Sequence, residues 1–177
     1  AASNELSFPR KHFNDADLAA GSDIDSLLQL GLDGADNKYG FLDISTQYSG
    51  TKAANISNYY AGISYLKLKE YQKAIEYLSK FSSDDEILGP TAFGAIGDAF
   101  ADIDQAEDAL EYYEKAAYNK DNEFTTPLFL FKAGRTAMDL GQFSKAEKIF
   151  TQIKENYSTT DSGKDIDKYI YSAKYAQ

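Results

Sequence analysis

The amino-acid sequence predicts an all-α fold made of three consecutive helical hairpins. Three glycines in helix-like patterns lie 35 and 37 residues apart, at Gly62, Gly97 and Gly134. An alanine follows each of them twelve residues later, at Ala74, Ala109 and Ala146. A fixed period of about 20–50 residues is the signature of a repeat architecture, in which neighbouring units bury one continuous core. The small residues let two helices approach closely, so we expect Gly97 to face Ala109, and Gly134 to face Ala146.

Each repeat divides into a first (A) helix, which contains the glycine, and a second (B) helix, which contains the alanine. The expected A and B helices are residues 52–68 and 70–81, then 87–102 and 104–119, then 126–140 and 142–156. Ser82 to Asp85 supplies a break with helix N-cap residues, and Lys120 to Asn122 supplies the next break. Pro127 suits the first turn of the third A helix, because its missing N–H has no helical partner there.

The segments on either side of the hairpins are predicted to complete the array. A degenerate fourth repeat is expected over residues 22–50, with an enlarged loop from Gly31 to Gly40 between its two helices. The last helix, residues 165–175, carries one apolar face made of Ile166, Tyr169, Ile170 and Ala173. It is expected to be a C-terminal cap with a polar outer side. We therefore divide the chain into residues 1–50, 51–157 and 158–177, all within one structural domain.

The recurring residues resemble the tetratricopeptide repeat (TPR), a helix–turn–helix of about 34 residues with the pattern W-x2-L-G-x2-Y, then A-x3-F, then P. The second repeat matches through Phe93, Ile96, Gly97, Phe100, Ala109 and Tyr113. Asn58 replaces the large aromatic residue in the first repeat, and the closing proline is absent from all three. The resemblance implies a right-handed α-α superhelix (a TPR solenoid) of three clear repeats, with a degenerate N-terminal repeat and a C-terminal capping helix.

Three stretches also look like one bacterial group within this class: residues 40–81, 89–97 and 121–134. These are membrane-tethered extracytoplasmic TPR proteins, similar to the ancillary subunit of the protein translocon. The resemblance implies a periplasmic location, an N-terminal anchor that is absent from this sequence, and a role in protein–protein contacts. A cytoplasmic location is the alternative.

Composition argues against most kinds of chemistry. The 177 residues include no Cys and one His, which excludes thiolate zinc sites, thiol nucleophiles and multi-His metal centres. No phosphate-binding, dinucleotide-binding or hydrolase motif occurs, and the acidic cluster from Asp15 to Asp25 fails the calcium-loop spacing. We therefore expect no enzyme activity, no cofactor and no metal. The net charge of −10 argues against a nucleic-acid partner.

The negative charge is concentrated in the second repeat. Residues 82–124 contain 12 acidic and 2 basic residues, whereas residues 51–81 have a net charge of +3. One interpretation is a solvated helix face. The other is a negative patch that attracts a basic partner, because charge complementarity mainly raises association rates and specificity.

The resemblance implies a partner-binding groove lined by the A helices. The predicted groove residues are Tyr59, Ile63, Leu66, Asp98, Asp102, Leu128, Phe131, Arg135 and Met138. They suit an amphipathic helix or an extended hydrophobic peptide of a partner protein. Gly94 is also expected to face inward, whereas the lysine, asparagine and arginine that clamp a terminal carboxylate in some family members are absent from the matching positions.

Two function hypotheses remain open from the sequence. The first is a non-enzymatic scaffold that binds a peptide or helix in the groove. The second is a structural or assembly subunit, or a homodimer, whose groove is filled by residues 3–19 or by the last helix, because a bare apolar groove is an aggregation hazard.

Overall fold

The computed structural model describes residues 2–176, and it confirms the all-α fold. About 72% of the chain is helical, and no strand in the described part exceeds two residues. Contacts group the chain into two compact units, Ala1–Ser82 and Ser83–Gln177, and each is described on its own. The expectation of one structural domain stays a prediction. No helix among the described residues is long and apolar enough to cross a membrane.

Unit 1 (Ala1–Ser82) contains the N-terminal helices and the first hairpin. Its elements are α1 (Ala2–Glu5), α2 (Ser7–Leu18), α3 (Asp23–Asp33), β1 (Gly34–Ala35), β2 (Lys38–Tyr39), α4 (Phe41–Gln47), α5 (Lys52–Lys67) and α6 (Tyr71–Ser79). The antiparallel strands β1 and β2 occupy the predicted enlarged loop between α3 and α4. The predicted helix pair of residues 22–50 therefore forms, but α3 packs mainly on α2, and α4 packs on α5.

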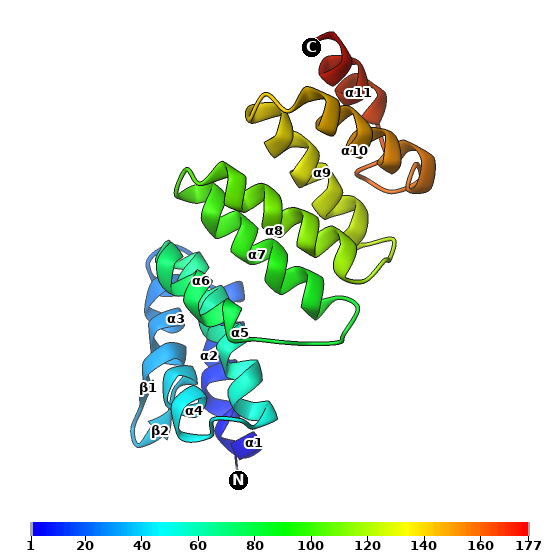
Figure 1. The fold of residues 1–177 in the computed structure, drawn as a ribbon. Coiled ribbons are helices and arrows are strands. Elements are labelled where there is room, and N and C mark those ends of the chain that lie inside the picture. Colours follow the sequence, from blue (N-terminus) through cyan, green and yellow to red (C-terminus); the bar gives the residue numbers. More distant parts are fainter. Residues whose placement is uncertain (1, 177) are drawn as a thin grey trace. The chain divides into compact units, whose positions relative to one another are not determined.

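Unit 2 (Ser83–Gln177) contains two hairpins and the capping helix. Its elements are α7 (Leu88–Asp102), α8 (Ala106–Asn119), α9 (Thr125–Asp139), α10 (Phe143–Asn156) and α11 (Ile166–Tyr175). Figure 1 shows these as successive helices, each packed on the next, with α7–α8 and α9–α10 as antiparallel hairpins. Ile166 and Ala173 of α11 are buried, and Tyr169 and Ile170 pack against the same core, as the predicted cap requires.

The A-to-B turn has the same backbone geometry in all three repeats. A residue with a left-handed backbone ends each A helix: Lys69 (φ 61°), Asp104 (φ 59°) and Gly141 (φ 69°). The next residue then donates its N–H to a carbonyl five positions earlier, as in the hydrogen bond from Gln105 to Phe100 of 2.9 Å. This is a Schellman-type helix end. The three left-handed residues lie 35 and 37 positions apart along the chain. This is the spacing of the glycines inside the A helices, although only one of the left-handed residues is a glycine.

The A-helix glycines lie at helix–helix contacts, but they face different residues from those predicted. A Cβ added at Gly97 would lie 2.7 Å from the ring of Tyr113, and one at Gly134 would lie 2.5 Å from the ring of Phe150. The nearest atoms thus belong to the residue four positions after each expected alanine. Helical side chains point back toward the N-terminus of their helix, so the ring of Tyr113 reaches toward the level of Ala109. The prediction that Gly97 and Gly134 face the alanines is therefore wrong in detail.

Candidate functional site

The predicted groove residues of unit 1 are Tyr59, Ile63 and Leu66. All three lie on α5, and their side chains are half-buried. The ring of Tyr59 packs against Tyr60 at 5.7 Å and against Phe81 at 5.1 Å between ring centroids. The ring of Tyr59 is therefore an internal packing element as well as part of the surface, and its burial raises the pKa of the phenol above its ordinary value.

Helix α2 covers a neighbouring part of α5. The ring of Phe13 meets that of Tyr60 edge-on at 5.0 Å, and the guanidinium of Arg10 lies 5.6 Å from the same Tyr60 ring. The ammonium group of Lys67 lies 5.3 Å from the ring of Phe13 and also pairs with Asp17. Residues of α2 thus occupy part of the surface of α5, although Tyr60 and Lys67 are not among the predicted groove residues.

In unit 2, Asp98 is already engaged by two neighbouring helices. Its carboxylate accepts a hydrogen bond of 2.7 Å from the hydroxyl of Tyr113 on α8. Lys132 on α9 donates to both carboxylate oxygens, at 2.6 and 2.8 Å. Asp98 therefore connects α7, α8 and α9. Burial, and then the hydrogen bond to the Asp98 carboxylate, raise the pKa of the Tyr113 phenol well above its ordinary value.

Helix α11 covers Phe131, one of the predicted groove residues. The rings of Phe131 and Tyr169 meet at right angles, 4.8 Å apart, and Phe150 lies 6.1 Å from Phe131. Met138 is half-buried and packs against the same core. Gly94, expected to face inward, is buried under the ring of Phe129. The wall of unit 2 is therefore partly filled by the chain itself.

The remaining predicted residues of unit 2 stay exposed. Asp102 lies at the end of α7, and Leu128 and Arg135 lie on one face of α9, seven residues apart. Two further exposed apolar residues, Ile87 and Phe124, immediately precede α7 and α9 and were not predicted as site residues. Both residues follow a glutamate at the start of an A helix, and they lie 37 positions apart. This recurrence is the sequence feature that could have indicated them.

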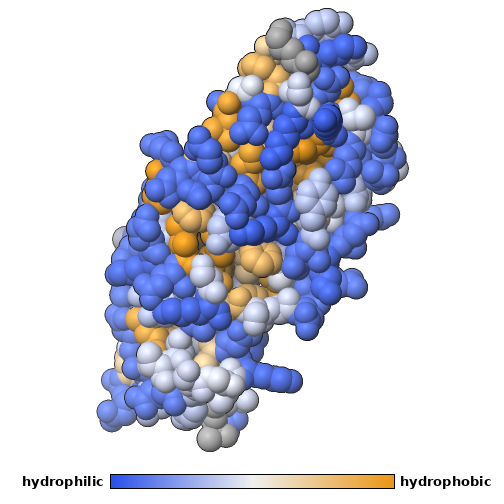
Figure 2. Space-filling model, in the orientation of Figure 1, coloured by the Kyte–Doolittle hydropathy of each residue, from blue (hydrophilic) through white to orange (hydrophobic). Residues whose placement is uncertain are grey.

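The surface between the apolar residues is hydrophilic. On the face that Figure 2 draws, hydrophobic residues form separate patches bordered by hydrophilic ones. The predicted apolar groove is therefore better described, from the residues above, as a mixed surface in which single apolar side chains stand among charged ones.

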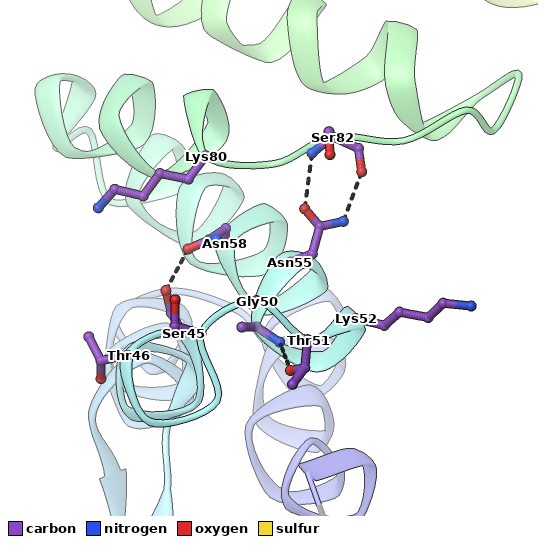
Figure 3. A pocket seen from close by; sticks show the side chains of 11 residues that line it. Ser45, Thr46, Gly50, Thr51, Lys52, Asn55, Asn58, Lys80 and Ser82 are labelled. Carbon is purple, nitrogen blue, oxygen red and sulfur yellow. Dashed lines mark hydrogen bonds between the residues drawn. The ribbon is translucent and has the colours of Figure 1, made fainter.

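A polar cavity of about 750 Å³ lies within unit 1, between the end of α4 and the start of α5 (Figure 3). Asn55 bonds to Ser82 through both of its amide atoms, at 2.8 and 3.0 Å. Asn58 accepts a hydrogen bond of 2.6 Å from Ser45, and this explains the asparagine found at the expected aromatic position. In Figure 3 the side chains of Lys52 and Lys80 extend away from the other labelled residues. These polar groups hold α4, α5 and residue 82 together, and we assign no ligand to the cavity.

No cluster of three His, Cys, Asp or Glu side chains suited to a metal ion occurs in the part of the chain that the structure describes. Asp98, the most highly connected acid of unit 2, is paired with a lysine and a tyrosine. Leu128, Arg135, Ile87 and Phe124 are exposed side chains of unit 2 that form no hydrogen bond or ion pair among the described residues.

Tyr113→Phe is expected to lower the free energy of unfolding at neutral pH by about 1 kcal/mol, because it removes the hydrogen bond to Asp98. The pKa of Tyr113 is raised in the folded state, whereas that of an unfolded tyrosine is about 10. The contribution of this phenol is thus complete below about pH 10 and is lost as the pH rises further. Urea unfolding at about pH 8 and about pH 11 should show a steeper alkaline loss in the wild type than in Tyr113→Phe.

Tyr112→Phe is the matched control, because the Tyr112 hydroxyl makes no hydrogen bond within the described residues. Equal alkaline losses in the wild type and in Tyr113→Phe would contradict the proposed linkage.

Comparison with known proteins identifies the repeats. One family model described as tetratricopeptide repeat matches residues 57–84 and 129–160, and a second with the same description matches residues 90–122. Together they cover more than half of the chain.

Among solved structures, one similar chain carries the nearly identical TPR-like repeats of a protein assigned as a kinesin light chain from Podosopora anserina. It superposes with a TM-score of 0.66 at 14% identity, and the match covers 98% of this chain and 85% of that one. A variant of that protein gives the same TM-score and the same coverage at 15% identity. No curated protein matches the chain. At these identities the likeness shows the fold alone.

Proposed function

Because this chain is built on tetratricopeptide repeats, we propose that it is a non-enzymatic scaffold that binds a peptide or a helix of a partner protein. Such repeats generally mediate protein–protein interaction. The observation that carries the proposal is the exposed face of α9 in unit 2, where Leu128 and Arg135 stay free while Phe131 and Asp98 are engaged internally. Arginine is enriched among the residues that dominate binding energy at protein interfaces, and Arg135 lies on the same face of α9 as the exposed Leu128.

The proposed binding surface is narrower than the groove expected from the sequence. It consists of Leu128 and Arg135 on α9, with Asp102 on α7. Phe131 contributes to it indirectly, because its packing on Tyr169 holds α9 and α11 together. The partner in this proposal is a protein. The net charge of −10 supports that choice over a nucleic acid.

Site-specific photo-crosslinking in the native cell tests the proposal. A photoreactive residue at position 128 or 135 should capture a distinct partner, whereas the same residue at exposed position 148 on α10 should not. Equal capture at all three positions, or capture at none, would remove the support for an α9 binding surface.

The self-filled alternative is supported by the packing of Tyr169 of α11 on Phe131, which is one of the predicted groove residues. In that case the chain is a structural subunit or a homodimer. A solution mass twice that of the 19.6 kDa chain, with crosslinks from position 128 only to a second copy, would favour this alternative over the scaffold.

The periplasmic or extracytoplasmic location, with an N-terminal tether, stays part of the proposal and is supported by the sequence resemblance alone. Fractionation of cells that express the natural full-length protein tests it. Recovery of the protein in the cytoplasmic fraction would contradict it.

A further inference from the structure

Two loops of unit 2 are built alike and lie against each other. They precede α7 and α9. In the first, Asp85 Oδ1 accepts hydrogen bonds from the N–H groups of Ile87 and Leu88, at 2.9 and 2.8 Å. In the second, Asn122 Oδ1 accepts from the N–H groups of Phe124 and Thr125, at 2.9 and 2.7 Å. The amide of Asn122 also donates to the carbonyl of Glu86 at 3.0 Å, which joins the two loops directly.

These ordered loops present large apolar side chains to solvent. Ile87 is 44% exposed, Phe124 is 77% exposed, and Leu128, one helical turn beyond Phe124, is 43% exposed. Single exposed apolar residues are common on protein surfaces and need no explanation. Here Ile87 and Phe124 stand on two loops that side-chain hydrogen bonds fix and join, and Leu128 lies in the first turns of α9, so all three side chains are presented from an ordered backbone.

The same loops carry a net negative charge, because Lys120 is the one basic residue among their acidic ones. Asp84, Glu86 and Glu123 are exposed, and no ion pair to their carboxylates occurs among the described residues. Two further carboxylates are used locally: Asp85 caps α7, and Asp121 accepts a hydrogen bond of 2.5 Å from the hydroxyl of Tyr157. Burial and this bond to Asp121 raise the pKa of Tyr157 to about 12. We call the surface made by Ile87, Phe124 and Leu128 with Asp84, Glu86 and Glu123 the acidic end of unit 2.

We infer that the acidic end of unit 2 docks a segment of another protein in which apolar side chains are flanked by lysine or arginine. Charge complementarity selects this partner: apolar anchors of the segment would cover Ile87, Phe124 and Leu128, and its basic residues would face the surrounding carboxylates. The inference rests on the proposed scaffold function and deepens it, since Leu128 belongs to both surfaces. It names the chemistry of the partner and extends the contact to the two loops.

A fluorescence-anisotropy titration with a synthetic probe tests the inference. The probe is a labelled short peptide in which leucine and phenylalanine are flanked by lysines, and the protein is the whole 177-residue chain. Ile87→Ser with Phe124→Ser should raise the Kd by about tenfold or more, because the apolar anchors are lost. Asp84→Asn with Glu86→Gln and Glu123→Gln should raise the Kd by about fivefold at low salt, and by much less at high salt, where charges are screened. Asp85 and Asn122 are left intact because they cap α7 and α9.

Matched controls separate this surface from nonspecific attraction to an acidic protein. Leu18→Ser removes an exposed apolar residue of unit 1. Asp104→Asn with Glu107→Gln and Asp108→Asn removes the same number of charges at the opposite end of the α7–α8 hairpin. Both controls should leave the Kd within about twofold of the wild type, and a peptide with glutamates in place of lysines should bind far more weakly.

Three results would overturn the inference: no binding of the lysine peptide, equal weakening by the control variants, or a Kd unaffected by changes at the acidic end. Sedimentation supplies a fourth, since a dimer that Ile87→Ser with Phe124→Ser converts to a monomer would assign this surface to a second copy. Partner crosslinking from position 128 with no peptide binding would retain the scaffold function and reject this docking site. Peptide binding at the acidic end, with no partner captured in cells, would retain this docking site and reject the scaffold function.

Discussion

Gly94→Ala is expected to lower the free energy of unfolding by about 1–3 kcal/mol, although this change in a helix interior ordinarily stabilises a protein by about 1 kcal/mol. A Cβ at position 94 would lie 1.9 Å from a ring carbon of Phe129 on α9. The ring cannot move aside cheaply, because Phe129 is only 4% exposed within a packed core. Urea denaturation of the two proteins measures the difference.

The double variant Gly94→Ala with Phe129→Leu separates the steric effect from helix propensity. Leucine lacks the ring atoms that would collide, so in the Phe129→Leu background Gly94→Ala should cost little or should stabilise. The same cost in both backgrounds would show that the contact between α7 and α9 at Gly94 is not what the substitution disrupts.

Phe131→Ala is expected to destabilise unit 2 by about 2 kcal/mol, less than the 3–5 kcal/mol typical of a fully buried phenylalanine. The ring is half-buried and packs against Tyr169 and Phe150, so its removal opens a cavity between α9, α10 and α11. Thermal denaturation measures the loss. Hydrogen exchange should also become faster in α11, because Tyr169 loses its edge-on contact.

Leu128→Ala is the matched control on the same helix. Leu128 is exposed, so its truncation should change stability by less than about 0.5 kcal/mol while weakening partner capture. The opposite pattern, in which Phe131→Ala weakens capture but leaves the denaturation curve unchanged, would mean that Phe131 lines an open groove and would reject its assignment as an internal contact.

The order and approximate bounds of the repeat helices α5 to α10 followed from the sequence because they depend on local spacing, whereas no bounds were predicted for α1 and α2. The spacing of Gly62, Gly97 and Gly134 placed the A helices, and the structure begins α5 at Lys52, α7 at Leu88 and α9 at Thr125, each within one residue of the expected start. A period repeated three times averages out the departures of any one copy, such as Asn58 at an aromatic position.

Some local geometry was hidden even within the repeats. The left-handed residues that end the A helices are Lys69, Asp104 and Gly141, and a lysine there has no sequence signature for this backbone conformation. The partner of Gly97 was misassigned to Ala109 because spacing along a helix does not state how far a ring such as that of Tyr113 reaches.

The sequence by itself determined the three helical hairpins and their order along the chain, since these follow from periodicity and residue type. Only the tertiary structure decided which predicted groove residues are free. Phe131 is covered by Tyr169, which lies 38 positions later, and Asp98 is neutralised by Lys132, 34 positions later. Such pairs have no fixed spacing in a sequence, because packing between separate helices, rather than local backbone geometry, brings them together.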